Sequence, residues 1–309
     1  MEDKKKLLVI DSNALLHRAF HALPPLTTKT GEPTGAIYGY LLTLFKAIKD
    51  LSPEYIVACF DTKAPTFRHE MFKEYKAQRP KTPEGIITQL PRTKDILKEF
   101  KIPVFAKEGV EADDLIATIS QLATKESNSL EVYILTGDLD NLQLVNDRIK
   151  VYTMGRGIKD LVIYDEEKVV ERFEVKPNQM TDFKALVGDT SDNIPGAPGI
   201  GNKTAAILIQ KYGSLTKIYE AAEKDDPEMK ASVKKTLLGF KEQVLLAREL
   251  VEMKKDVEID FSLRECFFGK FKKKDVERIL TEFDFTTLIK RLPSLIDFSS
   301  DGTEQRLLI

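Results

Sequence analysis

Short, unbroken hydrophobic runs alternate with longer amphipathic stretches in the first half of the chain. Three runs, Leu7–Ile10, Tyr55–Phe60 and Val132–Leu135, are rich in Val, Ile or Leu and do not alternate with polar residues. Such runs are typical of strands that are buried on both faces. Helical spacing between them predicts helices over 14–22, 35–49, 91–100 and 112–125. Strands that alternate with helices predict an α/β fold with a central, mostly parallel sheet flanked by helices.

The pattern changes near Asp165, after which strand-like runs fade and helical spacing dominates. Helices are expected over 166–173, 177–186, 203–212, 215–222, 241–253, 273–283 and 285–292. A polar tail follows and ends at Ile309. A chain of 309 residues is long enough for two domains. We therefore predict an α/β domain over residues 1–172 and a helical domain over residues 173–309 that includes the tail.

The amino-acid composition excludes several classes of protein. The chain is 42% hydrophobic and carries a net charge of −2, which excludes a disordered chain and a uniformly basic nucleic-acid binder. Two cysteines and three histidines exclude a disulfide scaffold and a zinc site built from Cys or His. Any metal must then be held by oxygen, as Mg²⁺ or Mn²⁺ is. Neither a signal peptide nor a stretch of ~20 apolar residues is seen, so a cytoplasmic protein without a membrane partner is expected.

Acidic residues stand where the predicted strands end and where later helices begin. Glu111 and Asp114 are three residues apart at a helix start, and Asp138 and Asp140 follow a strand. Each pair alone is more typical of a turn or of a helix N-terminus, where acids complement the helix dipole. The full set is Asp11, Asp61, Glu111, Asp113, Asp114, Asp138, Asp140, Asp189 and Asp192.

Considered together, the same acids favour a shared site over separate turns and helix starts. In open α/β sheets the ligand site lies beyond the carboxyl ends of the strands, so most of these carboxylates should meet in one pocket. Like charges brought together raise each other's pKa values and destabilise the fold, and divalent cations relieve that cost. Two such ions can activate a water and stabilise the leaving oxygen of a phosphodiester. A two-metal phosphodiesterase site is therefore the favoured hypothesis.

A basic segment follows the second strand. Residues 62–107 hold eleven Lys or Arg and five Asp or Glu, a net charge of +6, and the stretch Phe67–Arg79 interleaves aromatic and basic residues. A solvated amphipathic helix with its aromatics facing the core explains this pattern equally well. The functional interpretation is a positive funnel for the phosphates of a single strand, with Tyr75 available for base stacking.

A glycine-rich hairpin, Pro195–Ala205, lies between two predicted helices. Its Gly-x-Gly exposes backbone N–H groups at a helix start, and Lys203 adds a positive charge, which together favour a phosphate site. It follows no strand and lacks the P-loop spacing, so neither nucleotide-binding motif applies. A plain helix–turn–helix packing element is the structural alternative.

These motifs, in this order, resemble the 5′-nuclease (flap endonuclease-like) family. Within it they are most similar to the N-terminal 5′→3′ exonuclease domain of bacterial DNA polymerase I. The resemblance covers residues 7–292, and its most specific part is Gly-Val-Glu-Ala-Asp-Asp at Gly109–Asp114 together with Gly-Asp-Thr-Ser-Asp-Asn at Gly188–Asn193 and the hairpin. The other matching elements are 22–27, 31–35, 60–63, 67–70, 75–80 and 136–140.

The resemblance implies a metal-dependent phosphodiesterase that removes 5′ ends and flaps at nicks and junctions during replication and repair. Such a chain is either a stand-alone exonuclease or the N-terminal part of a DNA polymerase I. It implies a monomer that acts on DNA and on RNA primers, with two Mg²⁺ or Mn²⁺ ions and a K⁺ ion at a helix–hairpin–helix. Tyr75, Lys76, Arg68 and Arg79 would then lie on a helical arch, and Gly199, Gly201 and Lys203 would hold duplex DNA.

The family pattern also assigns roles to the acids. Asp138, Asp140, Asp189 and Asp192 would serve a second ion, while the other five anchor the metal beside the attacking water. Lys76 and Arg79, with Tyr75, would offset the charge that develops on the phosphate. Two departures, Ser12 and Leu139, remove no ligand and affect only fine substrate contacts.

Two other classes compete with the nuclease. A non-catalytic DNA-junction binding module would keep the hairpin and the arch but lack some acids, and here all nine are present. A haloacid-dehalogenase-like phosphatase also places an Asp after its first strand. That chemistry requires a second Asp two residues later, and this chain has Asn13 there.

Overall fold

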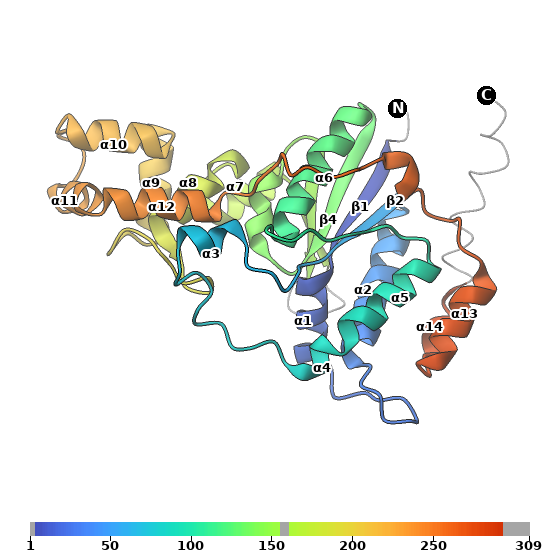
Figure 1. The fold of residues 1–309 in the computed structure, drawn as a ribbon. Helices are drawn as coiled ribbons and strands as arrows, with labels where there is room; N and C mark the ends of the chain where they lie inside the picture. The colour runs from blue at the N-terminus through green and yellow to red at the C-terminus, as the bar shows by residue number, and fades with distance from the viewer. Residues whose placement is uncertain (1–3, 155–160, 293–309) are drawn as a thin grey trace.

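The computed structural model describes residues 4–154 and 161–292, and its centre is a six-stranded sheet (Figure 1). The strand order is β3-β2-β1-β4-β5-β6, with the first five strands parallel and β6 antiparallel to β5. The prediction of a mostly parallel sheet is therefore confirmed. The strands are β1 (Lys5–Asp11), β2 (Tyr55–Cys59), β3 (Val104–Phe105), β4 (Leu130–Thr136), β5 (Ile149–Met154) and β6 (Leu161–Tyr164).

The three predicted strands, β1, β2 and β4, form the middle of the sheet. Leu8 of β1 pairs with Ile56 on one side and Tyr133 on the other. Four consecutive residues of β1, Leu7–Ile10, are fully buried, as expected for a strand covered on both faces. β3, β5 and β6 were not predicted, because β3 has two residues and β5 includes Lys150 and Thr153 within its apolar pattern.

Helices cover both faces of the sheet. Leu8 and Ile10 pack in one core with α1 (Ser12–Ala22), α2 (Gly35–Leu51) and α5 (Gln89–Glu99). Leu7 and Val9 point to the other face, into a core shared with α6 (Ala112–Glu126). Successive residues of β1 thus serve opposite layers, as the two-residue period of a strand requires.

The second half of the chain is mainly helical, as predicted, and its core is continuous with the α6 side of the sheet. One helix, α11, was not predicted. The elements are α7 (Glu166–Phe173), η2 (Pro177–Gln179), α8 (Met180–Val187), β7 (Gly188–Asp189), β8 (Ile194–Pro195), α9 (Asn202–Tyr212), α10 (Leu215–Glu223), α11 (Ala231–Gly239) and α12 (Lys241–Val251).

The last described helices return to the first half of the molecule. After η3 (Leu263–Cys266), α13 (Lys273–Glu282) and α14 (Thr286–Ile289) join the core that contains α2 and α5 (Figure 1). Residues 267–292 therefore pack on the α/β layer although they follow the helical part in sequence. The domain boundary at residue 172 stays a prediction, and the tail beyond residue 292 lies outside the described residues.

The basic segment is less helical than the resemblance implies. It contains α3 (Phe67–Met71), α4 (Glu84–Ile87) and all of α5, and only the chain between α3 and α4 consists of turns and extended backbone (Figure 1). Pro80 and Pro83 lack an N–H group, and Lys76 has a positive φ of 55°, so a continuous helix is not favoured here. The part of the predicted arch between α3 and α4 is thus not helical.

Across residues 4–154 and 161–292, no helix has the length and apolar character needed to cross a membrane.

Candidate active site

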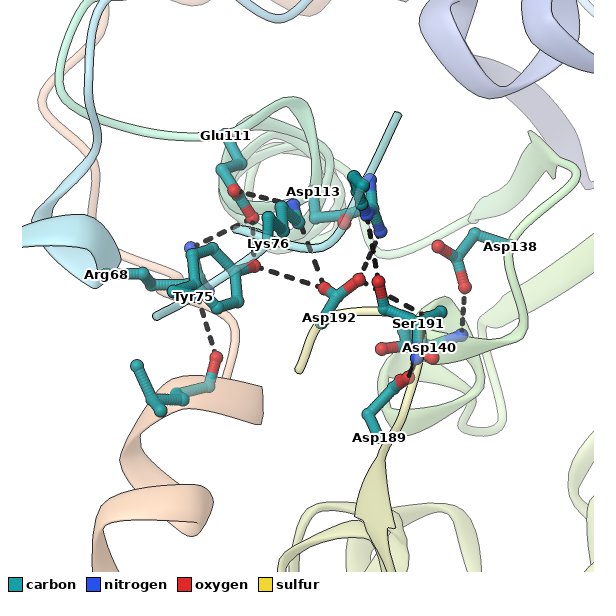
Figure 2. Close-up of polar contacts among 12 residues, drawn as sticks. Arg68, Tyr75, Lys76, Glu111, Asp113, Asp138, Asp140, Asp189, Ser191 and Asp192 are labelled. Atoms are coloured by element: carbon teal, nitrogen blue, oxygen red, sulfur yellow. Dashed lines mark hydrogen bonds and ion pairs between the residues drawn. The ribbon is translucent and has the colours of Figure 1, made fainter. Parts of the chain in front are cut away.

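A cavity of about 930 Å³ opens beyond the carboxyl ends of β1, β2 and β4. Segments far apart in sequence meet there, as Figure 2 shows for the residues on α6 and for those after β4 and β7. Seven of the nine predicted acids line the cavity: Asp11, Asp61, Glu111, Asp113, Asp138, Asp140 and Asp192.

Local hydrogen bonds hold several of these carboxylates in place. Asp11, the last residue of β1, accepts from the Ala14 N–H at 3.0 Å and from Thr136 Oγ1 at 2.6 Å. Asp138 follows β4 and accepts from the Asp140 N–H at 2.9 Å, at the start of the 3₁₀ helix η1 (Leu139–Leu144). Backbone donors at the starts of α1 and η1 therefore fix these two acids at strand ends, as is usual for N-terminal caps.

The start of α6 contributes two more acids. The Asp61 carboxylate accepts from the Ala112 N–H at 2.8 Å, which joins the end of β2 to this helix. Asp113 accepts from Asn141 Nδ2 at 2.9 Å, and the buried Oδ1 of Asn141 has no hydrogen-bond partner among the described residues. Asn141 is fully buried and does not itself line the cavity.

The cavity disfavours the charged form of its acids. Burial first, and then the charges of Asp61 and Asp138, raise the pKa of Asp11 to about 7. Burial and the charge of Asp138 likewise raise the pKa of Asp140 to about 7. The pKa of Asp113 rises well above its usual range for the same reasons, burial first and then the charges of Asp11 and Asp138. Bound cations would reverse these shifts, because they favour the ionised carboxylates.

The donor set suits a hard divalent cation, although the side chains as they stand do not form a ligand cage. The donors are carboxylate oxygens, which Mg²⁺ and Mn²⁺ prefer. Within the described residues, no three acidic, His or Cys side chains form a group that could hold a metal ion. Basic side chains are instead bound to the acids: Lys76 Nζ is 2.7 Å from Glu111 and 3.8 Å from Asp192, and Arg79 pairs with Asp192.

Tyr75 lies elsewhere than expected. We predicted a ring available for base stacking, but the side chain is 3% exposed. Its hydroxyl donates to Glu111 at 3.0 Å and to Asp192 at 3.2 Å, between the two carboxylates in Figure 2. The ring is part of the core, because an aromatic residue at this turn packs against α6.

Arg68 and Asp114 also depart from their predicted positions. The Arg68 side chain is buried and makes a bidentate ion pair with Asp114, at 2.7 and 2.9 Å. Burial lowers the pKa of Arg68, but its hydrogen bonds to Asp114 and the charge of that residue raise it overall. Asp114 is fully buried and does not line the cavity. The expected DNA contact and metal ligand are thus bound to each other.

Asp189, the second acid outside the cavity lining, pairs with a cation that sequence reasoning missed. Lys184 of α8 is 2.9 Å from Asp189 and also pairs with Asp140. Burial would raise the pKa of Asp189, but Lys184 and the hydrogen bonds from Ser191 lower it to about 2. A lysine within the mostly apolar face of a predicted helix was the one available signal.

The hairpin has the exposed backbone that its sequence predicted. Gly199 adopts a φ of +76°, and a hollow of about 510 Å³ is lined by Pro195–Gly201, Val187 and Gln243. Gln243 Nε2 donates to the Gly196 carbonyl at 2.7 Å and ties α12 to the hairpin. Lys203 is exposed in the first turn of α9. These features leave the N–H groups at the start of α9 accessible to an anion.

The sequence matches two family models in succession. Residues 6–174 match the 5′-3′ exonuclease N-terminal resolvase-like domain, and residues 175–274 match the 5′-3′ exonuclease C-terminal SAM fold. The chain belongs to the 5′-3′ exonuclease family. This membership supports the nuclease hypothesis and not the non-catalytic DNA-junction module.

Two kinds of relative are similar to this chain. A 5′-3′ exonuclease of Aquifex aeolicus is 36% identical over 294 residues, which cover 94% of this chain and 96% of the relative. DNA polymerase I of Bacillus subtilis is 37% identical over 292 residues, which cover 94% of this chain and 33% of the polymerase. The chain thus spans about a third of the length of the polymerase relatives.

Solved structures share the exonuclease fold. T5 5′-exonuclease with bound zinc superimposes with a TM-score of 0.65 at 22% identity, covering 92% of this chain and 98% of that one. The catalytic core of Rad2 in complex with a DNA substrate gives 0.63 at 17% identity, covering 96% of this chain and 92% of that one. At these identities the likeness establishes the fold.

Proposed function

We propose that this chain is a metal-dependent 5′→3′ exonuclease and structure-specific 5′-flap endonuclease. It hydrolyses DNA phosphodiesters at nicks, flaps and free 5′ ends in replication and repair. The observation that carries this proposal is the gathering of seven acids from distant segments in one cavity beside the basic segment. Two similar solved structures, one with bound zinc and the other in complex with a DNA substrate, support it.

The cofactor of this proposal is a pair of Mg²⁺ or Mn²⁺ ions. Asp11, Asp61, Glu111 and Asp113 would hold the first ion, and a second would be held by the remaining acids of the cavity together with Asp189. When bound, such ions activate a water for in-line attack and stabilise the leaving oxygen.

The basic residues of the chain supply the rest of the chemistry. Lys76 and Arg79 are bound to Glu111 and Asp192 at the cavity, and there they would offset negative charge that develops on the phosphate. The exposed Lys63 and Lys81 line the same cavity and would attract the 5′ strand. In this proposal the acids serve hydrolysis, and the basic segment serves capture of the 5′ strand.

The hairpin would hold the duplex away from the cavity. Gly199, Gly201 and Lys203 expose backbone N–H groups and one cation at the start of α9, which suits phosphate contacts without sequence readout. A K⁺ ion bound at this hairpin, hydrolysis of RNA primers and action as a monomer also belong to the proposal.

A 5′-labelled flap substrate tests the proposed function. Wild-type protein with Mg²⁺ or Mn²⁺ should release mononucleotides or whole flaps, and EDTA should stop cleavage. Asp113→Ala and Asp138→Ala should abolish cleavage while flap binding, measured by fluorescence anisotropy, persists. Asp147→Ala, at an exposed turn outside the cavity lining, is the matched control and should keep full activity.

Two results would reject the assignment. One is full cleavage in EDTA or by either cavity variant. The other is hydrolysis of a small phosphoester such as p-nitrophenyl phosphate without cleavage of DNA, which would favour the phosphatase class instead.

A further inference from the structure

The segment Leu250–Val257, which contains the last two residues of α12 and the chain after it, is bound to the rest of the molecule by side chains from three other elements. We call this segment the strap. Four of its carbonyls accept, and three of its N–H groups donate, side-chain hydrogen bonds between 2.8 and 3.4 Å. The side chains that hold it are Arg68 of α3, Asp114 and Thr118 of α6, and Gln143 of η1.

Arg68 and Asp114 form the centre of these contacts. Arg68 donates to the carbonyls of Leu250 and Glu252, at 2.8 and 2.9 Å, in addition to its two bonds with Asp114. Asp114 Oδ1 also accepts from the Lys254 N–H at 2.9 Å. The pair therefore joins α3, α6 and the strap at one buried point. This point borders the cavity, because Arg68 lines it and its Nη1 is also 3.5 Å from Glu111 Oε2.

Asp114 also holds the backbone of Glu111, the residue just before α6. Its Oδ2 accepts from the Glu111 N–H at 3.1 Å, while the Glu111 side chain extends into the cavity toward Lys76 (Figure 2). Both oxygens of Asp114 are thus occupied by Arg68 and by the N–H groups of Glu111 and Lys254. Asp114 itself does not line the cavity.

We propose that Asp114 and Arg68 are positioning residues, and that neither binds a metal ion nor contacts DNA. They fix the start of α6 and the base of the arch on the strap, so that Glu111 and Asp113 face the cavity. This inference rests on the proposed nuclease function, because it concerns the geometry of the same acids.

The two possible roles of Asp114 predict opposite effects on the metal-free protein. In the metal-free protein a metal-binding carboxylate is repelled by the neighbouring carboxylates. Replacing it by a neutral amide therefore keeps or raises the stability of the fold. A positioning partner is different, since its loss leaves the buried guanidinium of Arg68 without its counter-charge, which is strongly destabilising. Asp113, one residue earlier and in the cavity lining, provides the matched control.

Thermal unfolding in EDTA and Mn²⁺ titration calorimetry separate the two roles. Asp114→Asn should lower the Tm in EDTA by roughly 5 °C or more and change Mn²⁺ affinity by less than about threefold. Asp113→Asn should keep or raise that Tm and weaken Mn²⁺ binding by about tenfold or more. A tenfold loss of Mn²⁺ affinity in Asp114→Asn at unchanged Tm would identify Asp114 as a ligand and overturn the proposal.

The corresponding test for Arg68 uses Arg68→Lys, which keeps the charge but loses the bidentate geometry. We expect a lower Tm and flap-DNA affinity in EDTA within about threefold of the wild type. A tenfold weaker flap affinity at an unchanged Tm would place Arg68 on DNA and contradict the proposal.

Turnover distinguishes positioning from simple stabilisation. Asp114→Asn should lower kcat on the flap at least about tenfold with KM nearly unchanged, because misplacing Glu111 affects the reaction more than binding. The double variant Arg68→Met/Asp114→Leu should recover the Tm, because apolar residues can replace a buried ion pair. Its kcat should stay low, since the Glu111 and Lys254 N–H groups lose their acceptor.

A wild-type kcat in either Asp114→Asn or the double variant would show that the pair only stabilises the fold. Wild-type protein that neither binds Mn²⁺ nor cleaves the flap would instead reject the nuclease function itself, so the two failures are distinguishable.

Discussion

Asp11 and Asp189 are both acidic residues of the site, but their surroundings shift their pKa values in opposite directions. Burial without a basic partner raises the pKa of Asp11 to about 7. Although burial acts in the same direction on Asp189, Lys184 outweighs it and lowers the pKa to about 2. Asp11 is therefore the acid with more to gain from a bound cation, and the two residues are not equivalent members of one cluster.

The raised pKa of Asp11 predicts how Asp11→Asn changes stability with pH. In EDTA the folded protein keeps a proton on Asp11 up to about pH 7, whereas the unfolded chain releases it near pH 4. The folded state binds more protons over this range, so the wild type loses stability as pH rises from about 4 to 7. Asp11→Asn lacks that loss, and its stability relative to wild type should increase by about 2–4 kcal/mol between pH 5 and pH 8.

Urea unfolding in EDTA at the two pH values measures this difference. Asp147→Asn, at an exposed turn, serves as the control and should show no such trend. A constant or decreasing difference for Asp11→Asn would mean that the Asp11 carboxylate is already ionised in the folded protein at pH 5.

At the scale of elements, the sequence pattern was most informative where burial is uniform. The runs at β1, β2 and β4 are apolar throughout, and their burial on both faces confirmed the prediction. β5 lies nearer the sheet edge, and its sequence, IKVYTM, is neither an unbroken apolar run nor a strict alternation, so it gives a weaker strand signal. The arch was expected to be helical because the family resemblance implies it, and that resemblance does not include the turn that this chain makes at Lys76.

The sequence could predict only those site residues whose positions are set by the ends of the parallel strands. Asp11, Asp61 and Asp138 follow parallel strands, so topology alone places them at one edge of the sheet. The position of Arg68 depends on carbonyls 182 and 184 residues later in the chain. No local sequence pattern reveals a contact over such a distance in the chain. The residues around Arg68 are equally compatible with an arginine that is buried and with an arginine that contacts DNA.

The short β7–β8 pair carries the turn with Asp189 and Asp192, and two glycines make its close approach possible. A Cβ on Gly196 would lie 2.3 Å from the Val187 carbonyl carbon and 2.4 Å from the Gly188 N. We expect Gly196→Ala to destabilise the protein by about 3 kcal/mol or more, because backbone atoms cannot yield as a flexible side chain would. Gly201→Ala, with nothing within 4 Å of the added Cβ, should cost less than about 0.5 kcal/mol.

Chemical denaturation of the two alanine variants tests this prediction. Equal stabilities would show that the β7–β8 backbone opens at little cost, and the turn would then not hold its two acids rigidly.

At the scale of the whole molecule, opposite charges lie close together although the net charge is only −2. Seven acids line the cavity, and Lys63, Lys76, Arg79 and Lys81 line the same cavity. Without divalent ions the acids repel a phosphate backbone, so strand capture depends on the basic residues. Of these, Lys76 and Arg79 are already paired with acids, which leaves the exposed Lys63 and Lys81 as the cations best placed to meet an incoming strand.

The salt dependence of flap binding tests whether Lys63 and Lys81 contact the incoming strand. Each phosphate contact contributes about −0.7 to the slope of log affinity against log salt for a single strand, so Lys63→Gln/Lys81→Gln should reduce the magnitude of that slope by about 1.4. Lys98→Gln/Lys101→Gln removes two charges from the same basic segment, at the amino end of β3 and outside the cavity lining, and should leave the slope unchanged. Fluorescence anisotropy of a 5′-flap substrate in EDTA, over a KCl series, measures both. Equal changes for the two pairs would mean that the basic segment attracts DNA through its total charge, and that the strand has no defined path past the cavity.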